Sequence, residues 1–202
     1  MRALLQADNV SIQFHTSQST VQAVRGVSFS LYEGETLAIV GESGCGKSVL
    51  CKSILRLLPH SGAISNGKLL FQGQDLTALS EKEMDRIRGS EIAMVFQDPM
   101  TSLNPTMPVG KQIMEVILQH EKISKKEAKA RALFWMETVG LDHPEARFAQ
   151  VPHHFSGGMR QRAVIAMALA CHPKMLIADE PTTALDVTIQ AQILQLLKQL
   201  NE

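Results

Sequence analysis

The chain has 202 residues, of which 45% are hydrophobic and 20% are charged, and its 20 lysines and arginines balance 20 aspartates and glutamates. This length fits one medium domain, or a core with a smaller appended subdomain, and the composition is typical of a globular protein with a sizeable core. A formal net charge of zero excludes a whole-protein field that would attract nucleic acid, although it does not exclude a local basic patch. We therefore expect no nucleic-acid partner.

The cysteines and the hydropathy exclude further classes. The three cysteines match neither a disulfide framework nor a zinc spacing, which suits a reducing compartment. The opening stretch MRALLQADNVSIQF has neither the apolar run nor the cleavage site of a signal peptide. No window approaches the roughly 20 apolar residues that span a bilayer, so we expect any work at a membrane to proceed through a partner.

The N-terminal part is predicted to be rich in strands. Segments 4–14, 21–32 and 36–40 are β-branched and apolar, with turn residues between them. The third, TLAIV, is a short unbroken apolar run before a glycine-rich loop, which is typical of a parallel strand buried on both faces. Residues 47–58 are predicted to form a helix, and residues 66–73 a short strand or hairpin arm.

The middle of the chain is predicted to be mainly helical. Two capping boxes, each a serine followed three residues later by a glutamate, open helices at 80–83 and at 124–127. Between them, EIAMVFQ at 91–97 is predicted to be a strand, and the proline-rich stretch after it marks a boundary. The helical character of residues 100–155 predicts an all-helical insertion in an otherwise α/β core.

The last third returns to alternating strand and helix. Ser156 is a natural N-cap for a helix over 156–170. MLIAD at 175–179 is predicted to be a second fully buried strand, and the following stretch repeats apolar residues at helical spacing.

GESGCGKS at residues 41–48 matches the phosphate-loop pattern G-x-x-x-x-G-K-[ST] and lies between a predicted strand and a predicted helix. Its glycines allow consecutive backbone N–H groups to surround phosphate oxygens, and the helix that follows adds its positive dipole end. Lys47 can reach the β- and γ-phosphates, and the Ser48 hydroxyl can ligate Mg²⁺. The predicted nucleotide-binding residues here are Gly41, Glu42, Ser43, Gly44, Cys45, Gly46, Lys47 and Ser48.

Two adjacent acids, Asp179 and Glu180, directly follow the apolar run MLIA. An acid pair alone is more often a helix cap or a solvated turn, but a phosphate loop in the same chain reverses that preference. At the carboxyl end of a parallel strand, Asp179 can hold Mg²⁺ through its water shell. Glu180 can polarise the attacking water as a general base.

HFSGGMRQR at 154–162 contains a second element suited to phosphate. Ser156, Gly157 and Gly158 leave a helix N-terminus with close backbone access, which predicts a second anion site. One chain then has two phosphate-binding elements but one lysine-bearing loop, so the second element is expected to serve a nucleotide held by another subunit. Taken together, these motifs resemble the ATP-binding subunit of an ABC transporter, whose signature is similar to FSGGM with leucine for Phe155 and glutamine for Met159.

The resemblance covers the whole chain and implies further site residues. Gln97 in VFQDPMTSLNP matches the family's glutamine loop, which contacts the γ-phosphate and Mg²⁺ near the permease. Asp186 in TALD matches the loop that meets the partner subunit. Phe14 lies where family members place an aromatic ring against adenine, although a phenylalanine at a strand end is equally expected in a core. Several stretches, among them ADEPTTALDVTIQAQIL, most resemble the dipeptide, oligopeptide and nickel importer branch.

The expected fold is α/β, a P-loop NTPase core with a mostly parallel sheet, an N-terminal antiparallel β subdomain and an inserted α-helical subdomain. The expected divisions are 1–99 for the β subdomain and phosphate-loop part, 100–155 for the helical subdomain, and 156–202 for the signature helix, the acid-bearing strand and the following helix.

The resemblance implies an ATPase that uses ATP and Mg²⁺, with Glu180, Gln97 and Lys47 as its catalytic residues. Its implied partners are a second ATP-binding subunit, identical or paralogous, integral-membrane permease subunits, and indirectly a solute-binding protein. Its implied place is peripheral, on the cytoplasmic face of the plasma membrane.

Family members also carry a histidine on a strand after the helix that begins near Thr188, and none of the seven histidines follows Glu180. We therefore expect the chain to be a fragment. Two alternatives stay open: a truncated, non-catalytic nucleotide-binding or dimerisation module, and a soluble ABC-type ATPase without a permease.

Overall fold

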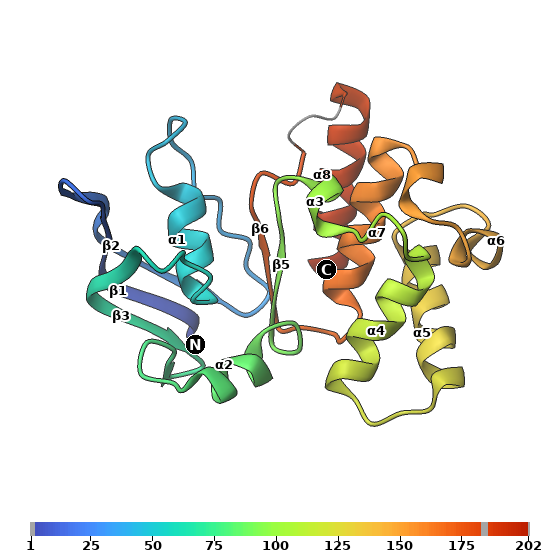
Figure 1. Cartoon of the computed structure of the whole chain (residues 1–202), viewed down its shortest axis with the longest axis horizontal. Coiled ribbons are helices and arrows are strands. Elements are labelled where there is room, and N and C mark those ends of the chain that lie inside the picture. The colour runs from blue at the N-terminus through green and yellow to red at the C-terminus, as the bar shows by residue number, and fades with distance from the viewer. Residues whose placement is uncertain (1–2, 183–185, 202) are drawn as a thin grey trace. The chain divides into compact units, whose positions relative to one another are not determined.

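The computed structural model describes residues 3–182 and 186–201, which form two compact units (Figure 1). The first unit comprises the described residues up to Asp85, and the second extends from Arg86 to Leu200. The domain divisions expected from the sequence stay a prediction.

The first unit is built on an antiparallel sheet with strand order β2-β1-β3-β4. Strands β1 (Ala3–His15) and β2 (Thr20–Tyr32) form a long hairpin, and β3 (Gly62–Phe71) and β4 (Gln74–Asp75) extend it on the other side of β1. The first two strands confirm their prediction. Apolar side chains fill its buried face, including Leu5, Val10, Ile12, Leu69 and Phe71.

The prediction of a strand at residues 36–40 is wrong, because this segment forms no regular structure. Leu37 and Ile39 are 40% and 39% exposed, and Val40 is 87% exposed. A short parallel strand depends on hydrogen-bonding neighbours along its edges, and none of the described strands pairs with this segment. The apolar pattern is therefore compatible with a strand, but it does not show whether neighbouring strands are present to pair with it.

Helix α1 (Lys47–Ile54) begins as predicted but ends four residues earlier than the predicted limit of residue 58. Arg56, just after it, has a positive φ of 53°, a backbone conformation that does not continue a right-handed helix. Helix α2 (Glu81–Ile87) begins at the predicted capping box. The Ser80 N–H donates to the Glu83 carboxylate at 2.8 Å, and the Glu83 N–H donates to the Ser80 hydroxyl at 3.4 Å.

The second unit combines a parallel strand pair with helices. Strands β5 (Ile92–Val95) and β6 (Met175–Ala178) are parallel and in register from Ile92 and Met175 to Val95 and Ala178. Strand β6 is less buried than predicted, because Ala178 is exposed. The helices are α3 (Pro99–Ser102), α4 (Val109–His120), α5 (Lys125–Thr138), α6 (Pro144–Phe148), the 3₁₀ helix η1 (Pro152–His154), α7 (Gly157–Leu169) and α8 (Val187–Asn201).

A single apolar core joins helices α4, α5, α7 and α8, which lie close together in Figure 1. Its fully buried members include Ile113, Met136, Ile165 and Ile193. The described elements between Pro99 and His154 are all helices, which confirms the helical character predicted for residues 100–155.

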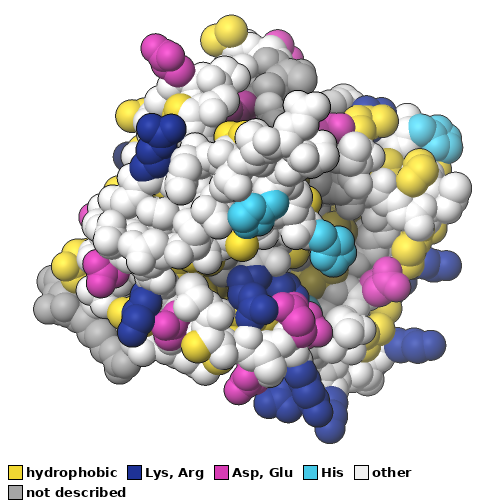
Figure 2. Space-filling model, turned by 60° about the vertical axis from the view of Figure 1, so that its left-hand side comes forward, with side chains coloured by type: hydrophobic (Ala, Val, Ile, Leu, Met, Phe, Trp, Pro, Cys, Tyr) yellow, Lys and Arg dark blue, Asp and Glu magenta, His cyan; other side chains and the backbone are white. Residues whose placement is uncertain are grey.

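Within the described ranges, no helix combines the length and apolarity needed to cross a bilayer. On the face in Figure 2, basic and acidic side chains are interspersed, as the balanced composition leads one to expect.

The capping box of α5 gives a prediction for stability. The Ser124 hydroxyl and N–H bond the Glu127 carboxylate and hold its pKa below the usual value of 4.5. This stabilisation is therefore present at neutral pH and is lost as the pH falls below 4.5. We expect Ser124→Ala to lower the free energy of unfolding by about 1 kcal/mol at pH 7 and by less at pH 3.

The single tryptophan, Trp135, lies in α5 and reports this unfolding by its fluorescence in urea. Lys126→Ala, an exposed change in the same turn, is the control. Equal losses for Ser124→Ala at both pH values would contradict a role for the ionised carboxylate.

Candidate functional site

The phosphate loop, residues 41–48, lies on the surface and runs from the irregular segment into the first turn of α1. Gly44 and Gly46 have positive φ values of 79° and 97°, so glycine suits both positions. A Cβ on Gly46 would also lie 2.5 Å from the carbonyl oxygen of Ala23 in β2. Gly46 thus allows the start of α1 to approach β2 closely.

The Lys47 side chain turns back over this loop. Its Nζ donates to the carbonyl oxygens of Gly41 at 2.9 Å and Glu42 at 2.8 Å. An ammonium group held by backbone carbonyls at a helix N-terminus is in place to exchange them for phosphate oxygens, which carry more negative charge. The loop therefore presents its cation to an anionic ligand.

Phe14 lies in the same unit, at the end of β1. It is half-buried and pairs with Gly62 of β3. A Cβ on Gly62 would lie 2.6 Å from Cε1 of Phe14, so the ring covers the Gly62 backbone. This packing gives Phe14 a structural role, and its contact with adenine stays a prediction.

Asp179 and Glu180 follow β6 in the second unit, as predicted. Asp179 is 5% exposed, and its N–H donates to the Val95 carbonyl at 2.9 Å, which extends the parallel ladder. Glu180 is exposed and has a positive φ of 49°. A non-glycine residue in this left-handed region is uncommon, and such strain is characteristic of functional turns.

Gln97 lies beside these acids. Its Nε2 donates to Oε2 of Glu180 at 2.9 Å across 83 residues of sequence. Sequence reasoning did not predict this contact. The available signal was the order of the strands, because Gln97 and Glu180 each follow the end of a parallel strand, and such ends meet at one edge of a sheet.

The Ser156–Gly158 turn begins α7. The Ser156 hydroxyl accepts the N–H of Met159 at 3.3 Å and caps the helix as predicted. A Cβ on Gly158 would lie 2.8 Å from Cγ2 of Ile189, so this glycine lets α7 and α8 approach closely. The turn therefore combines an exposed helix N-terminus with a tight helix–helix contact.

Phe155, just before that turn, is 2% exposed and belongs to the helical core. We expect Phe155→Ala to cost about 3–5 kcal/mol of unfolding free energy, because it leaves a cavity. Phe155→Leu should cost less than about 1.5 kcal/mol, since it retains an apolar side chain of similar length. Urea denaturation followed by Trp135 fluorescence measures both, and equal losses for the two variants would contradict a packing role.

Asp186 caps α8. Its Oδ1 accepts the N–H of Ile189 at 3.0 Å, and its carbonyl accepts the N–H of Gln190 at 2.9 Å. The rest of the TALD loop, residues 183–185, lies outside the described residues. The expected contact of Asp186 with a partner subunit stays a prediction.

The sequence predicts three magnesium donors: the Ser48 hydroxyl in the first unit, and the Gln97 amide oxygen and the Asp179 carboxylate in the second. All three would bind through oxygen, which Mg²⁺ prefers. Mg²⁺ sites usually have few protein ligands, and water and phosphate oxygens complete the coordination. Gln97 donates to Glu180 through its amide nitrogen, so its amide oxygen takes no part in that hydrogen bond. Across the described ranges, no cluster of three or more His, Cys, Asp or Glu side chains forms an all-protein metal site.

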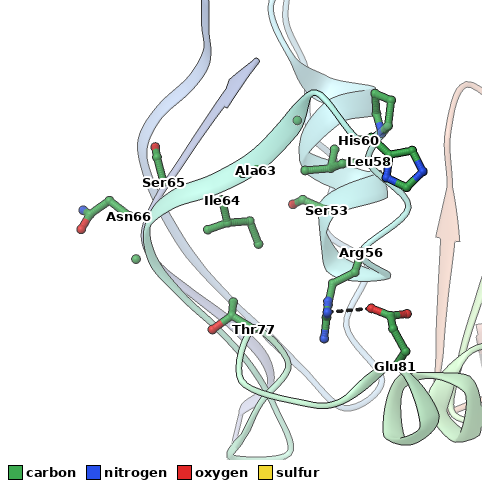
Figure 3. Close-up of a pocket in the computed structure, with 13 residues that line it drawn as sticks. Ser53, Arg56, Leu58, His60, Ala63, Ile64, Ser65, Asn66, Thr77 and Glu81 are labelled. Atoms are coloured by element: carbon green, nitrogen blue, oxygen red, sulfur yellow. Dashed lines mark hydrogen bonds and ion pairs between the residues drawn. The ribbon is translucent and has the colours of Figure 1, made fainter. Parts of the chain in front are cut away.

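A pocket of about 860 Å³ lies elsewhere in the first unit, beside α1 and β3 (Figure 3). Arg56 reaches into it but forms an ion pair with Glu81 at 2.6 Å and donates to the Leu79 carbonyl. None of the predicted site residues lines this pocket. Because its arginine is already paired, the phosphate loop remains the better candidate for an anionic ligand.

Comparisons with known proteins identify the family of the chain. The ABC transporter family model matches residues 24–183. The oligopeptide transport ATP-binding protein OppD of Bacillus subtilis (strain 168) is 63% identical over 200 residues, which are 98% of this chain and 56% of OppD. The dipeptide transport ATP-binding protein DppD of the same organism is 59% identical over 201 residues, which are 99% of this chain and 60% of DppD. The chain thus spans little more than half the length of these relatives.

A solved structure is similar in fold. The dimeric, post-hydrolysis structure of the ATP-binding cassette MJ0796, bound to ADP and Pi, has a TM-score of 0.85 and 31% sequence identity. The match covers 98% of this chain and 83% of that one. It confirms the predicted α/β fold of a P-loop NTPase with an antiparallel N-terminal sheet and a helical insertion. On the family match and these identities, the chain belongs to the ABC transporter family and is similar to its ATP-binding subunits.

Proposed function

We propose that the chain belongs to an ATP-hydrolysing subunit that powers an importer of peptides. The observation that carries this proposal is the hydrogen bond between Gln97 and Glu180, which places a candidate base beside a candidate sensor of the γ-phosphate. A protein that only binds nucleotide needs neither group in this position.

The phosphate loop binds ATP through its backbone N–H groups and Lys47. On binding, Lys47 exchanges the carbonyls of Gly41 and Glu42 for oxygens of the β- and γ-phosphates. Ser48, Gln97 and Asp179 would hold Mg²⁺, which would neutralise charge on the phosphates. Glu180 then accepts a proton from the attacking water, once Gln97 no longer occupies its carboxylate.

The Ser156–Gly158 turn binds the phosphates of a nucleotide held by a second subunit. Its exposed N-terminus on a 13-residue helix supplies N–H groups and a positive dipole end. The cassette MJ0796 was solved as a dimer with ADP and Pi, which supports this arrangement. ATP binding closes the pair of subunits, and hydrolysis reopens it.

Peptides are the proposed cargo, because the relatives OppD and DppD are named for oligopeptide and dipeptide transport. The proposed partners are permease subunits and, through them, a solute-binding protein. The subunit itself lies on the cytoplasmic face of the membrane, and the permease and binding protein select the peptide.

The test is ATP hydrolysis by the full-length protein, copurified with its permease and reconstituted with an oligopeptide or a dipeptide. We expect peptide to stimulate phosphate release and Lys47→Ala to abolish that stimulation. ATP binding without turnover would favour the non-catalytic module. Turnover by protein that copurifies with no permease would favour the soluble ATPase.

A further inference from the structure

Helices α7 and α8 lie side by side, and their contact begins at the signature turn (Figure 1). The first contact is Gly158 against Ile189, where any added Cβ would approach Cγ2 to 2.8 Å. One turn further along, the Arg162 Nη2 donates to the Gln192 side-chain oxygen at 3.1 Å. Because both contacts advance in the same direction, the two capped N-termini, at Ser156 and Asp186, lie at the same end of the pair.

Arg162 also reaches a third helix. Its Nη1 donates at 2.5 Å to the carbonyl of Val139, the residue that ends α5. The next residue, Gly140, has a φ of 75°, and a Cβ there would lie 2.9 Å from Nη1. The glycine thus provides both the helix-ending conformation and the space for the guanidinium group.

The three-way contact is energetically significant. Val139 is fully buried, so its carbonyl would lose a hydrogen bond without Arg162. A positive charge at the C-terminal end of α5 is also favoured by that helix's dipole. Lysine cannot reproduce the contact, because its ammonium is a compact point charge and cannot direct two fixed N–H groups to two acceptors.

We propose that Arg162 is a positioning residue for ATP hydrolysis. Arg162 and Gln192 lie six residues after Ser156 and Asp186 respectively (162 − 156 and 192 − 186), which is about 9 Å along each helix. The guanidinium group therefore fixes the signature turn, the start of α8 and the end of α5 as one body. This body presents Ser156–Gly158 to the nucleotide of the second subunit, so Arg162 affects closure and turnover but not ATP capture by the Lys47 loop.

This inference rests on the proposed function, and its test uses the full-length protein with its permease. ATP affinity, kcat and KM are measured for Arg162→Ala, Arg162→Lys, Gln192→Ala and the double variant Arg162→Ala/Gln192→Ala. Gln195→Ala is the matched control, because Gln195 is the same residue type and lies exposed on the same helix. The guanidinium group of Arg162 donates to Val139 and Gln192 and not to Gln195.

We expect Arg162→Ala to lower kcat about tenfold, with KM and ATP affinity unchanged within about twofold. Arg162→Lys should recover part of kcat, and Gln192→Ala should lower it about threefold. The double variant should be no slower than Arg162→Ala, and Gln195→Ala should match the wild type. A general loss of stability would instead lower ATP binding together with turnover.

Two results would overturn the inference: a kcat for Arg162→Ala within about twofold of wild type, or multiplicative effects of the two single substitutions. If Arg162→Ala fails to fold, the kcat values of Arg162→Lys and Gln192→Ala test the inference instead. Arg162→Lys keeps a charged side chain, and Gln192→Ala removes only one neutral acceptor. Lys47→Ala distinguishes a failure of the proposed function from a failure of this inference. If it leaves turnover intact, the proposed function fails, and if it abolishes turnover while the Arg162 variants are silent, only this inference fails.

Discussion

Lys47→Ala is expected to weaken ATP binding by about 100-fold or more, because it removes the one side-chain cation of the phosphate loop. In the structure this ammonium group lies against the carbonyls of Gly41 and Glu42 at the exposed mouth of the loop. Its position costs little to change, since a phosphate is a stronger acceptor than a backbone carbonyl. Equilibrium binding of a fluorescent ATP analogue measures the effect.

The matched control is Lys52→Ala, which removes the same charge from the last turn of the same helix. It should leave affinity within about twofold, because its ammonium group is more than one helical turn beyond the loop. Tight ATP binding by Lys47→Ala would contradict the assignment of residues 41–48 as the nucleotide site.

Glu180→Gln is expected to retain ATP binding and to lower turnover by about 100- to 10,000-fold, the usual contribution of a general base. The amide is nearly isosteric, and its oxygen can still accept the Gln97 N–H that Glu180 accepts now at 2.9 Å. The structure of the turn should therefore persist while proton transfer is lost. An ATP-bound dimer should accumulate, which light scattering detects as a doubled mass.

Glu137→Gln, an exposed carboxylate on α5, serves as the control and should change neither binding nor turnover. Turnover by Glu180→Gln within about tenfold of the wild type would assign the base elsewhere.

Much of the local structure is predictable because its causes are local. The hairpin of β1 and β2 follows from β-branched residues, and the starts of α2 and α5 follow from the capping boxes at Ser80 and Ser124. The signature helix follows from the Ser156 cap. In each case the stabilising contacts lie within a few residues of one another.

The prediction of a strand at residues 36–40 is wrong for the opposite reason. Its apolar sequence fits a buried parallel strand, but a parallel strand is fixed by neighbours far away in sequence. None of the described strands pairs with it, and Val40 is 87% exposed. Hydrophobic pattern alone does not supply the partner.

The residues of the candidate site also fall into those that are predictable from local sequence and those that are not. The phosphate loop, the acid pair and the Ser-Gly-Gly turn are contiguous in sequence and could be predicted as motifs. The contact of Gln97 with Glu180 and the three-way contact of Arg162 join distant segments, so only the fold reveals them. Helix α7 contains two arginines, Arg160 and Arg162, and the sequence pattern alone does not separate them.

Ser156–Gly158 are proposed to complete a nucleotide site on another subunit. Ser156→Asp and Ser156→Asn test it most directly, because both side chains cap a helix while only aspartate repels a phosphate. ATP affinity and phosphate release are measured on the same preparations of full-length protein. We expect unchanged affinity for both variants and turnover at least about tenfold lower for Ser156→Asp than for Ser156→Asn. Equal turnover of the two variants would contradict it.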